Sequence, residues 1–566
     1  MFHYHPDGYV YWFLALWLLF PIVLVAWLYL RPRLSLERPV GRLLRALAHR
    51  QWVAMGILFL IVLCINILLA WICYPQPRIH DEFAYQLAAD TYAGGRLANP
   101  THPFWQHFET FHVLSEPTYM AKYPLGSGMA LALGQRLTGH SIVGGWLVMA
   151  AGVAALFWML KSWIPSRWAF AGCLLIAINP YWLSNWGQTW WGGAVPFLAG
   201  ALLFGSTKRL VDQMPCLSVP QALLYSSVFS VAASMLAMSR PFEGLIACAV
   251  SGCLLVRGAI LSWEGVRRRM VPLSLPCILI GALAISFLGQ NNLAVTGDVT
   301  QLPYSLHSQR YNASTMWVFG KTPPIPEYRL PRMREFYVGW SRGIYEKAQT
   351  LSGYLELAPQ KLNLCLQFYP LFGGVCLLPL IFMRRKEDNW LRLCVWTIGL
   401  VMGLHLLMNF SSVFPHYVAP FACLFYVLAF HGLRCWYIAS RWDALAAYVL
   451  PGVVCWSLLR FVFLIVFTFS QIGTNTPRAS VEQYLSEVDG SHLVFVDYPE
   501  EYSVHQEWVY NRADIDGSEI VWAHSLGMAQ DQKLVEYFQD QGQDRQVWRW
   551  DAGSDLKRIS SDSESP

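Results

Sequence analysis

The sequence predicts a polytopic all-α membrane protein with a small exported α/β domain at its C-terminus. Of its 566 residues, 55% are hydrophobic and only 14% are charged, whereas ordinary globular domains carry about a quarter charged residues. Apolar stretches of about 20 residues, long enough to cross a bilayer as helices, recur between short basic clusters. Residues 475–566 have a net charge of −11, so residues 1–474 carry +16. Cytoplasmic anchoring explains that excess, and no nucleic-acid partner is implied.

The first apolar run, 9–30, predicts a retained membrane helix and not a cleavable signal peptide. It is too long for the apolar region of a signal peptide, and no Lys or Arg precedes it. It also ends in Arg-Pro-Arg where a cleavage site would have small residues. Residues 1–51 are therefore expected to be an extra N-terminal helix followed by a basic cytoplasmic loop, 31–51.

The topology depends on residues 124–137. Placing 31–51 in the cytoplasm by the positive-inside rule exports the segment 75–140, unless 124–137 crosses the membrane. These 14 residues are short for a span and contain several glycines, which is typical of a re-entrant helix. If they do not cross, every later basic cluster falls inside, and we therefore predict a re-entrant helix. The clusters are Lys161/Arg167, Lys208/Arg209, Arg257 with Arg267–Arg269, Arg384–Lys386 with Arg392, and Arg434/Arg441.

About 12 transmembrane helices follow from this assignment. Residues 52–470 form one transmembrane domain with two large exported loops, 75–140 and 290–362. The predicted spans are 9–30, 52–74, 141–160, 168–186, 190–206, 222–239, 242–257, 271–289, 363–383, 391–409, 414–434 and 444–470.

Residues 471–559 predict a small periplasmic α/β domain, and 560–566 a disordered tail. The pattern indicates helices near 480–488 and 528–541, with strands or short strand signals at 492–498, 507–510, 519–523 and 546–551.

The most informative segment is 79–85, Ile-His-Asp-Glu-Phe-Ala-Tyr, directly after the second apolar run. Its adjacent carboxylates, Asp81 and Glu82, lie just beyond hydrocarbon depth, where ionised groups are costly unless they serve a function. The alternative is that both acids pair with Arg78 or Arg96 at a helix end.

Four features together resemble the GT-C superfamily of membrane glycosyltransferases. These are the acidic pair, the turn Lys122-Tyr123-Pro124-Leu125 before a short half-buried helix, a second large exported loop, and an exported C-terminal domain. The branch that is most similar contains the protein O-mannosyltransferases and the aminoarabinose transferases of lipid A, and is glycosyltransferase family 39-like. The resemblance covers roughly 50–470. The chain departs from it by the extra N-terminal helix and by Tyr-Pro-Leu-Gly where the family has a double proline, which leaves the acceptor open.

The resemblance implies a glycosyltransferase with its active site on the exported side of the bacterial inner membrane. It would move a sugar from a polyprenyl-phosphate-linked donor to a lipid, glycan or protein acceptor. Asp81 is the expected general base, a role typically worth roughly 10²–10⁴-fold, and Glu82 an acceptor-orienting or metal-contacting neighbour. The expected ligands of the donor phosphate are Arg240, Lys122 and His416. The expected substrate contacts are Tyr85, Tyr123, Glu243, Tyr417, His102 and Trp191.

Each of these residues also has a structural interpretation. Lys122 fits an interfacial lysine that snorkels to water, and Arg240 fits a local pair with Glu243, three residues on. His416 fits a hydrogen-bonded interfacial histidine. Trp191 fits an aromatic anchor at the membrane boundary, together with Trp186 and Trp190.

No metal site or cofactor is assigned from the sequence, and a divalent metal is left open. His102, His107 and His112 recur every five residues, which suits neither one helical face nor a zinc signature, so surface or packing roles are favoured. The thirteen cysteines lie mostly in apolar runs without a CxxC spacing and are expected to be small core residues.

Three other functions compete with the glycosyltransferase. A transporter would place charged residues within spans and show repeated halves or paired broken helices; here the notable polar residues gather at exported ends. A non-catalytic scaffold that binds lipid-linked sugars is the second alternative. The third is a polymerase or ligase that moves whole oligosaccharides, with which the long loop 290–362 is compatible.

Overall fold

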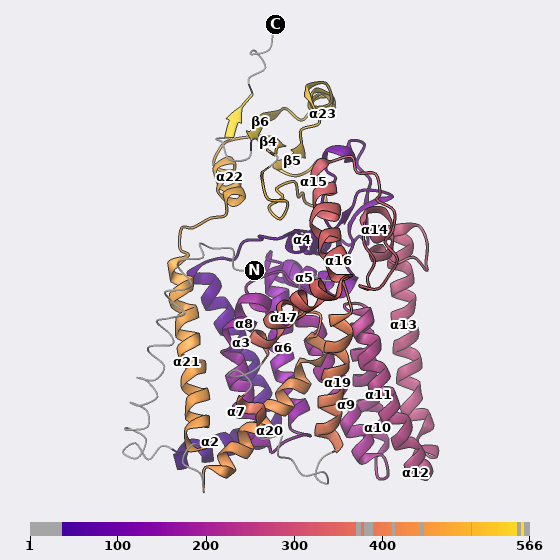
Figure 1. Ribbon diagram of the computed structural model, residues 1–566, viewed down its shortest axis with the longest axis vertical. Helices are drawn as coiled ribbons and strands as arrows, with labels where there is room; N and C mark the ends of the chain where they lie inside the picture. Colours follow the sequence, from indigo (N-terminus) through magenta and orange to yellow (C-terminus); the bar gives the residue numbers. More distant parts are fainter. Residues whose placement is uncertain are drawn as a thin grey trace.

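The computed structural model describes residues 37–369, 375–378, 389–409, 414–441, 446–499, 501–551 and 556–559. Among these residues, nine helices are long and apolar enough to cross a membrane, and they stand side by side as a bundle (Figure 1). They are α3 (Gln51–Ile72), α6 (Ile142–Leu160), α9 (Ala194–Gln213), α10 (Val219–Ala237), α11 (Pro241–Leu261), α13 (Met270–Thr296), α19 (Asn389–Leu406), α20 (Ala422–Ala439, after the 3₁₀ turn η5, Ala419–Phe421) and α21 (Ala446–Ser470).

Three of the predicted spans have no matching long helix in this set. The span 9–30 lies outside the described residues, and 363–383 lies partly outside them and begins inside α17 (Leu351–Phe368). The span 168–186 is wrong as a single helix. It is divided into α7 (Ser166–Ala177), α8 (Pro180–Trp182) and the π-helical turn η2 (Leu183–Gly187). Pro180 cannot donate a backbone hydrogen bond, and the Asn179 side chain accepts from the Tyr181 N–H at 3.0 Å, which starts a new helix.

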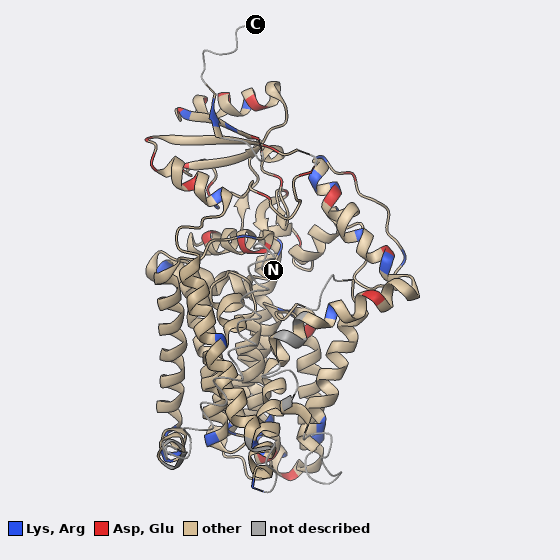
Figure 2. Ribbon diagram, turned by 60° about the vertical axis from the view of Figure 1, so that its left-hand side comes forward, with Lys and Arg blue, Asp and Glu red and all other residues tan. Residues whose placement is uncertain are grey.

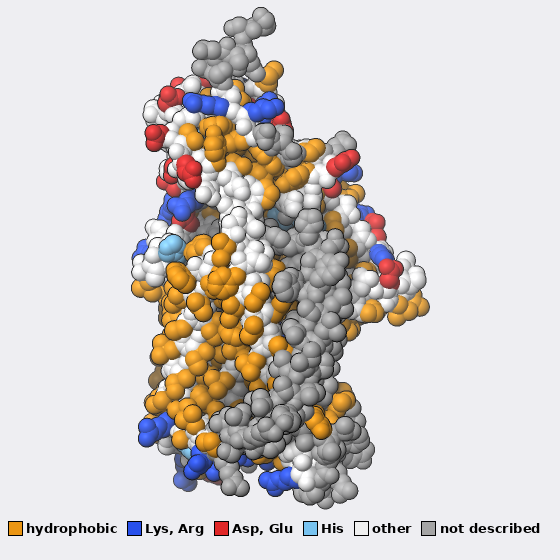
Figure 3. All heavy atoms as spheres, turned by 90° about the vertical axis from the view of Figure 1, so that its left-hand side faces the viewer, with side chains coloured by type: hydrophobic (Ala, Val, Ile, Leu, Met, Phe, Trp, Pro, Cys, Tyr) orange, Lys and Arg blue, Asp and Glu red, His pale blue; other side chains and the backbone are white. Residues whose placement is uncertain are grey.

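The bundle has a buried aromatic core and an apolar outer surface. Trp182 packs against Trp186 and Phe197 at ring-centroid distances of 4.6 and 4.3 Å, and all three side chains are buried. On the outside, hydrophobic side chains cover the flank while charged ones gather toward its two ends (Figure 3). Such an extended apolar flank is what a bilayer would cover.

The basic side chains of the bundle lie mainly at the end away from the C-terminal domain (Figure 2). At that end are the amphipathic helix α2 (Glu37–His49) and the short α12 (Trp263–Arg267). Arg45 of α2 and Arg167 of α7 line one small surface pocket there. The predicted cytoplasmic loops 31–51 and 161–167 are thus neighbours in space.

The first predicted exported segment folds across the opposite end of the bundle. It contains α4 (His80–Ala93), the 3₁₀ turn η1 (Trp105–His107), a small sheet and α5 (Leu125–Thr138). The sheet has the antiparallel order β1-β3-β2, from β1 (Asn99–Pro100), β3 (Thr118–Ala121) and β2 (Val113–Leu114). Helix α5 matches the predicted short helix 124–137 within one residue.

The second predicted exported segment is mostly helical. It comprises α14 (Pro303–Tyr311), α15 (Pro331–Arg334), the π-helical η3 (Glu335–Arg342) and α16 (Gly343–Ala348), and it leads into α17. Elements α15, η3 and α16 rise beside the C-terminal domain (Figure 1). A 3₁₀ turn, η4 (Val375–Leu377), follows α17 within the described part of the chain.

The C-terminal domain is an α/β unit, as predicted. Its four-stranded sheet has the order β5-β4-β6-β7, with β4 parallel to both neighbours and β7 antiparallel to β6. The prediction misses β7 and wrongly makes 507–510 a strand. In the structure the Glu507 carboxylate accepts the backbone N–H groups of Trp508 and Val509, each at 2.9 Å, so no neighbouring strand takes them. The elements are α22 (Pro477–Ser486), β4 (Ser491–Asp497), β5 (Ile520–His524), α23 (Met528–Asp540), β6 (Arg545–Asp551) and β7 (Leu556–Arg558).

Candidate functional site

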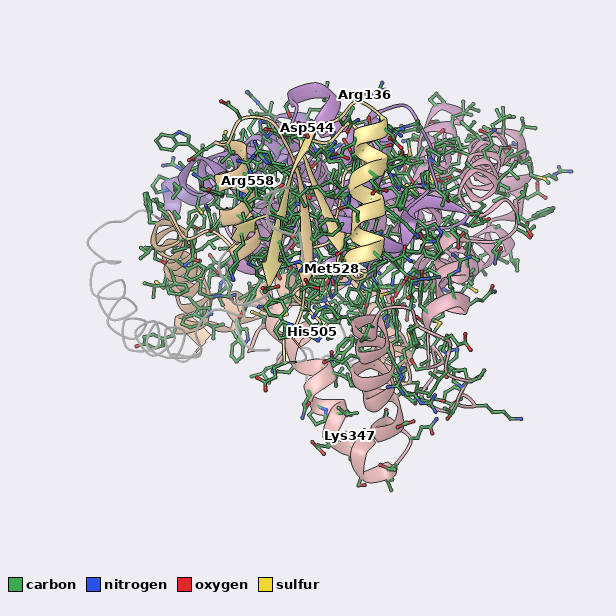
Figure 4. The ribbon with its side chains drawn as sticks, turned by 90° about the horizontal axis from the view of Figure 1, so that it is seen from above. Arg136, Lys347, His505, Met528, Asp544 and Arg558 are labelled. Atoms are coloured by element: carbon green, nitrogen blue, oxygen red, sulfur yellow. The ribbon has the colours of Figure 1, made fainter. Side chains whose placement is uncertain are left out.

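A cavity of about 2060 Å³ lies between the bundle and the elements above it. The start of α4, the turn 122–125, the α10–α11 junction and the C-terminal loop 502–508 all contribute to its lining. Viewed from above, His505 lies between the C-terminal sheet and α16, the helix that carries Lys347 (Figure 4). Ten of the eleven predicted site residues line this one cavity: Asp81, Glu82, Tyr85, Lys122, Tyr123, Trp191, Arg240, Glu243, His416 and Tyr417.

Asp81 is in the first turn of α4, where a helix N-terminus favours a negative charge. Its Oδ1 accepts a hydrogen bond from the Tyr123 hydroxyl at 2.6 Å, and its Oδ2 lies 3.9 Å from His112 Nε2. Burial and the nearby Asp81 charge raise the pKa of Tyr123 well above its ordinary value, so this hydroxyl keeps its proton. The Asp81 side chain is 27% exposed. It is therefore a carboxylate held by a neutral donor and still open to the cavity.

Glu82, the adjacent acid, is oriented differently. Its Oε2 accepts the backbone N–H groups of Arg78 at 2.8 Å and Ile79 at 3.3 Å, and its Oε1 accepts that of Trp190 at 3.3 Å. Burial raises the pKa of Glu82 to about 7, although these hydrogen bonds oppose the shift. Oε2 thus caps α4, and Oε1 ties the helix to the segment after η2. This is close to the helix-end interpretation, with backbone N–H groups as the hydrogen-bond donors.

Lys122 is buried beside Asp81 and His112. Its Nζ lies 2.8 Å from His112 Nδ1 and 5.2 Å from the ring centroid of Tyr304. Burial lowers the pKa of Lys122 to about 8, an effect that the negative charge of Asp81 opposes. Lys122 is therefore not a snorkelling surface lysine but a cation whose charge depends on its surroundings near neutral pH.

Arg240 caps α11 and faces the cavity. Its guanidinium carbon is 5.0 Å from the ring centroid of Tyr417, and its Nε is buried without a hydrogen-bond partner among the described residues. Glu243, the alternative partner considered from the sequence, instead lies 3.1 Å from His405 Nε2 through its Oε1. The local-pair interpretation of Arg240 therefore does not describe its geometry.

A close backbone approach brings the Lys122 turn to the α10–α11 junction. The Gly126 N–H donates to the Met238 carbonyl at 2.7 Å, and a Cβ at Gly126 would lie only 2.8 Å from that oxygen. Only glycine fits there without a shift of the backbone. Because Met238 is two residues before Arg240, this contact brings the Lys122 turn close to the Arg240 backbone.

The charges of Arg240 and Asp81 both shift the pKa values of two cavity tyrosines. Tyr85 stacks on Tyr123 with ring centroids 4.5 Å apart, and burial raises the pKa of Tyr85 to about 12, while Arg240 lowers it and Asp81 raises it. The pKa of Tyr304 is likewise raised by burial, lowered by Arg240 and raised by Glu243 and Asp81. The charges of Asp81 and Arg240 therefore both influence the same two tyrosine side chains.

His416 and Trp191 form an aromatic wall of the cavity. Their ring centroids are 4.5 Å apart, and Phe414 stacks on His416 at 5.5 Å. The Trp191 Nε1 is buried and without a hydrogen-bond partner in the part of the chain that is described. Trp186 and Trp190 are buried in the interior, so none of the three tryptophans has the position of an outward-facing anchor.

The three regularly spaced histidines do not converge. His102 Nε2 pairs with Asp516 at 2.9 Å, and His107 Nδ1 lies 2.8 Å from the His524 carbonyl, both in the C-terminal domain. Only His112 reaches the cavity. The prediction that His102 contacts substrate is not matched by its position, because it holds the domain interface. Within the described ranges, no group of three or more His, Cys, Asp or Glu side chains could hold a metal ion.

Sequence reasoning missed the upper wall of the cavity. It is formed by Phe336 and Trp340 of η3 and by the loop 502–508. The ring centroids of Trp340 and His505 are 4.7 Å apart. No sequence motif marks the residues of this wall. His112, elsewhere in the cavity lining, was noticed in the sequence only through the regular spacing of the three histidines.

No protein-family model matches the sequence, and no curated protein is similar to it. Several solved structures overlap with the chain. ArnT from Cupriavidus metallidurans overlaps in the apo state with a TM-score of 0.45 at 14% identity, covering 82% of this chain and 84% of ArnT. ArnT bound to undecaprenyl phosphate overlaps with a TM-score of 0.46 at 13% identity, covering 88% and 92%.

A third structure is the archaeal oligosaccharyltransferase AglB from Archaeoglobus fulgidus, in complex with an inhibitory peptide and a dolichol-phosphate. It overlaps with a TM-score of 0.46 at 11% identity, covering 91% of this chain and 75% of AglB. Overlaps this loose assign no role to any residue, so the function has to be argued from the cavity.

Proposed function

We propose that this chain is a GT-C-type glycosyltransferase of the bacterial inner membrane. It transfers a sugar from a polyprenyl-phosphate-linked donor to an acceptor at the exported face, with Asp81 as the general base. The observation that carries the proposal is one cavity at the ends of apolar helices that holds both an open carboxylate and a cation with a buried, unused N–H group. The carboxylate is Asp81, and the cation is Arg240, whose Nε has no partner among the described residues.

The cations match the needs of a phosphate leaving group. As the sugar–phosphate bond breaks, negative charge grows on the phosphate oxygens, and fixed donors in a dry site stabilise it. Arg240 supplies an unused N–H and a permanent charge. Lys122 adds a second charge when it is protonated, and His416 a buried imidazole. The prenyl chain of the donor would remain in lipid along the apolar flank.

The carboxylate matches the needs of the acceptor. The acceptor oxygen forms the new bond to the anomeric carbon, the bond from that carbon to the phosphate oxygen breaks, and the polyprenyl phosphate leaves with the electron pair. Asp81 takes the hydroxyl proton through the carboxylate that Tyr123 holds by its hydrogen bond at 2.6 Å. Tyr85, Trp191, Glu243 and Tyr417 line the space for the sugars. Glu82 supports the site by fixing the start of α4.

The distribution of basic residues supports a periplasmic position for the cavity. The basic residues of the bundle lie at the end opposite the C-terminal domain (Figure 2), and cytoplasmic loops carry the excess of Lys and Arg. The cavity and the C-terminal domain then face the periplasm. On this orientation α5 does not cross the bilayer, in agreement with the proposed re-entrant helix.

The test uses the purified full chain and a panel of undecaprenyl-phosphate sugars. Release of undecaprenyl phosphate is followed with and without added lipid, glycan and peptide acceptors. We expect turnover with at least one donor, a loss of roughly 10²–10⁴-fold in Asp81→Asn, and unchanged binding of undecaprenyl phosphate in that variant. The control is Asp298→Asn, which changes an exposed acid in a turn of the second exported segment.

Two outcomes would contradict the proposal. Binding of undecaprenyl phosphate without turnover by the wild type on every donor and acceptor would indicate a scaffold. Movement of an intact lipid-linked sugar across proteoliposomes, unaffected by Asp81→Asn, would indicate a transporter.

A further inference from the structure

His112 has an unusual backbone conformation for its residue type. Its φ of 65° is the one positive value at a non-glycine residue in the described part of the chain. Side chains other than glycine pay a steric cost there, which histidine bears better than most, and such conformations persist only where their surroundings impose them. Here the surroundings are the small sheet, since the His112 carbonyl accepts the Lys122 N–H at 3.0 Å just before β2 begins. The conformation directs the His112 ring into the cavity.

The ring of His112 joins the two charged groups that the proposed reaction needs. Nδ1 lies 2.8 Å from Lys122 Nζ, and Nε2 lies 3.9 Å from Asp81 Oδ2. A lysine ammonium can only donate, so Nδ1 must accept from it, and the single proton of a neutral imidazole is then on Nε2. That N–H faces the carboxylate that would act as the base. At 3.9 Å the contact is longer than a hydrogen bond, and it would have to shorten when substrate is bound.

Packing holds the ring in this orientation. Aromatic rings surround it, with centroid distances of 5.9 Å to Tyr123, 5.8 Å to Phe336, 5.7 Å to His80 and 6.2 Å to His307. Burial lowers the pKa of His112 well below its ordinary value, and the positive charge of Lys122 adds to this effect. The titratable groups that face His112 are Lys122, Asp81, Tyr123, His80, His307 and His505.

We propose that His112 is a positioning residue that orients Asp81 through Nε2–H and holds Lys122 against the donor phosphate through Nδ1. It touches neither the breaking bond nor the forming one, so it acts through these two partners. This role rests on the proposed function of the cavity. It also gives the third regularly spaced histidine a task different from those of His102 and His107, which hold the domain interface.

Two substitutions separate the two contacts. In His112→Asn the side-chain oxygen stands near the position of Nδ1, and asparagine tolerates the left-handed backbone, so the Lys122 contact is kept and the Asp81 contact is lost. In His112→Gln the amide nitrogen stands near Nε2, so the Asp81 contact is kept and the Lys122 contact is lost. His307→Asn is the matched control, because it removes a neighbouring buried imidazole that bonds the Tyr337 hydroxyl and neither charged group.

The experiment measures undecaprenyl phosphate binding against pH, and turnover on the donor that the panel selects. We expect His112→Asn to bind within about twofold of the wild type but to lose about 10²-fold in turnover, the effect of a misplaced catalytic group. We expect the pH at which binding falls to half its plateau to drop by about one unit in His112→Gln, because Lys122 loses an acceptor for its charged form. His307→Asn, which removes one of the rings packed around His112, should change each readout much less than the His112 variants do.

The two proposals fail in different ways. Absence of turnover by the wild type would contradict the proposed function. Wild-type turnover together with full turnover in His112→Asn, or with equal losses in His112→Asn, His112→Gln and His307→Asn, would contradict the role of His112 alone. If His112→Gln does not fold, the split between binding and turnover in His112→Asn decides the question.

Discussion

The lower and upper walls of the cavity use their charged side chains in opposite ways. The lower wall, made by α4, the Lys122 turn and the α10–α11 junction, keeps Asp81 partly open and Arg240 Nε without a partner among the described residues. The upper wall, made by η3 and the loop 502–508, is joined to α15 by a buried ion pair. There Arg332 Nε lies 3.2 Å from Glu507 Oε2, and the two side chains are 10% and 1% exposed.

The difference indicates that the lower wall binds the substrates, whereas the upper wall holds the domains together. Glu507 also accepts from the Tyr498 hydroxyl and from the backbone of the loop that it belongs to, while Arg332 donates to the carbonyls of Tyr502 and Ser503. These contacts join the C-terminal domain to the second predicted exported segment, and the Arg332–Glu507 pair is almost fully buried. Substitutions in the upper wall should therefore change stability, and those in the lower wall should change binding and turnover.

The largest expected effect comes from breaking the buried pair of the upper wall. Arg332→Met leaves Glu507 buried without its partner, which costs about 3–5 kcal/mol. We expect a large fall in the unfolding temperature of the detergent-solubilised protein and faster proteolysis near residues 471–476. Arg342→Met is the control, because its partner Glu346 is 56% exposed and surface pairs contribute about 0–1 kcal/mol. Equal losses in the two variants would show that Arg332 and Glu507 do not hold the wall.

The next effect tests the lower wall. Arg240→Gln removes the permanent charge beside the proposed phosphate position, and hydrogen bonds to charged groups contribute roughly 1.5–3 kcal/mol. We expect undecaprenyl phosphate to bind about 10- to 100-fold more weakly, with little change in unfolding temperature. Arg310→Gln serves for comparison, since its guanidinium donates to the Glu116 carbonyl at 2.8 Å and does not line the cavity. An equal loss of affinity in Arg310→Gln would show that Arg240 has no specific role in binding the phosphate.

Lys122 should make phosphate binding depend on pH. Its folded pKa of about 8 lies below the ordinary value of 10.5, so its charge is present at pH 7 and lost as the pH rises through 8 and 9. Affinity for undecaprenyl phosphate should fall over the same window in the wild type. In Lys122→Met binding should be weaker at pH 7 and flat up to pH 9. A fall of equal size in Lys122→Met would assign the titration to another group.

The smallest effect concerns the domain interface. His102→Asn removes the contact with Asp516, whose side chain is 32% exposed, and such a pair contributes about 0–1 kcal/mol. We expect a fall of a few degrees at most in unfolding temperature and unchanged turnover. Asp516→Asn should behave alike, and the double variant should lose less than the sum of the single losses. A loss of turnover in His102→Asn would instead support the predicted contact of His102 with substrate.

Local sequence signals predicted the gathering of Asp81, Lys122 and Arg240, but not their partners. The acid pair, the Lys-Tyr-Pro turn and the Arg-Pro helix start each mark what the sequence predicts to be the exported end of an apolar run. Helix ends on the same face of a bundle lie near one another. Asp81 is held by the Tyr123 hydroxyl, 42 residues away, and Glu82 accepts from the Trp190 N–H, 108 residues away, in addition to its local backbone donors. No local pattern carries that information.

The two elements that were predicted wrongly share a local cause. Hydropathy joined 168–186 into one span because the apolar count outweighed Asn179-Pro180, although a side-chain cap at that point starts a new helix. Alternation at 507–510 indicated a strand, but Glu507 takes the backbone donors that a neighbouring strand would need. In both cases a side chain bonds backbone N–H groups one or two residues further along the chain, and neither hydropathy nor alternation detects such a bond.

The most direct test of the central claim is an experimental structure of the chain with undecaprenyl phosphate bound. The account predicts the phosphate in the cavity, within hydrogen-bond distance of Arg240, with Asp81 facing the position of the sugar and the prenyl chain leaving toward the apolar flank. Density for the phosphate at the basic end of the bundle, or a lipid-filled cavity in which Asp81 is sealed off from the headgroup, would contradict it.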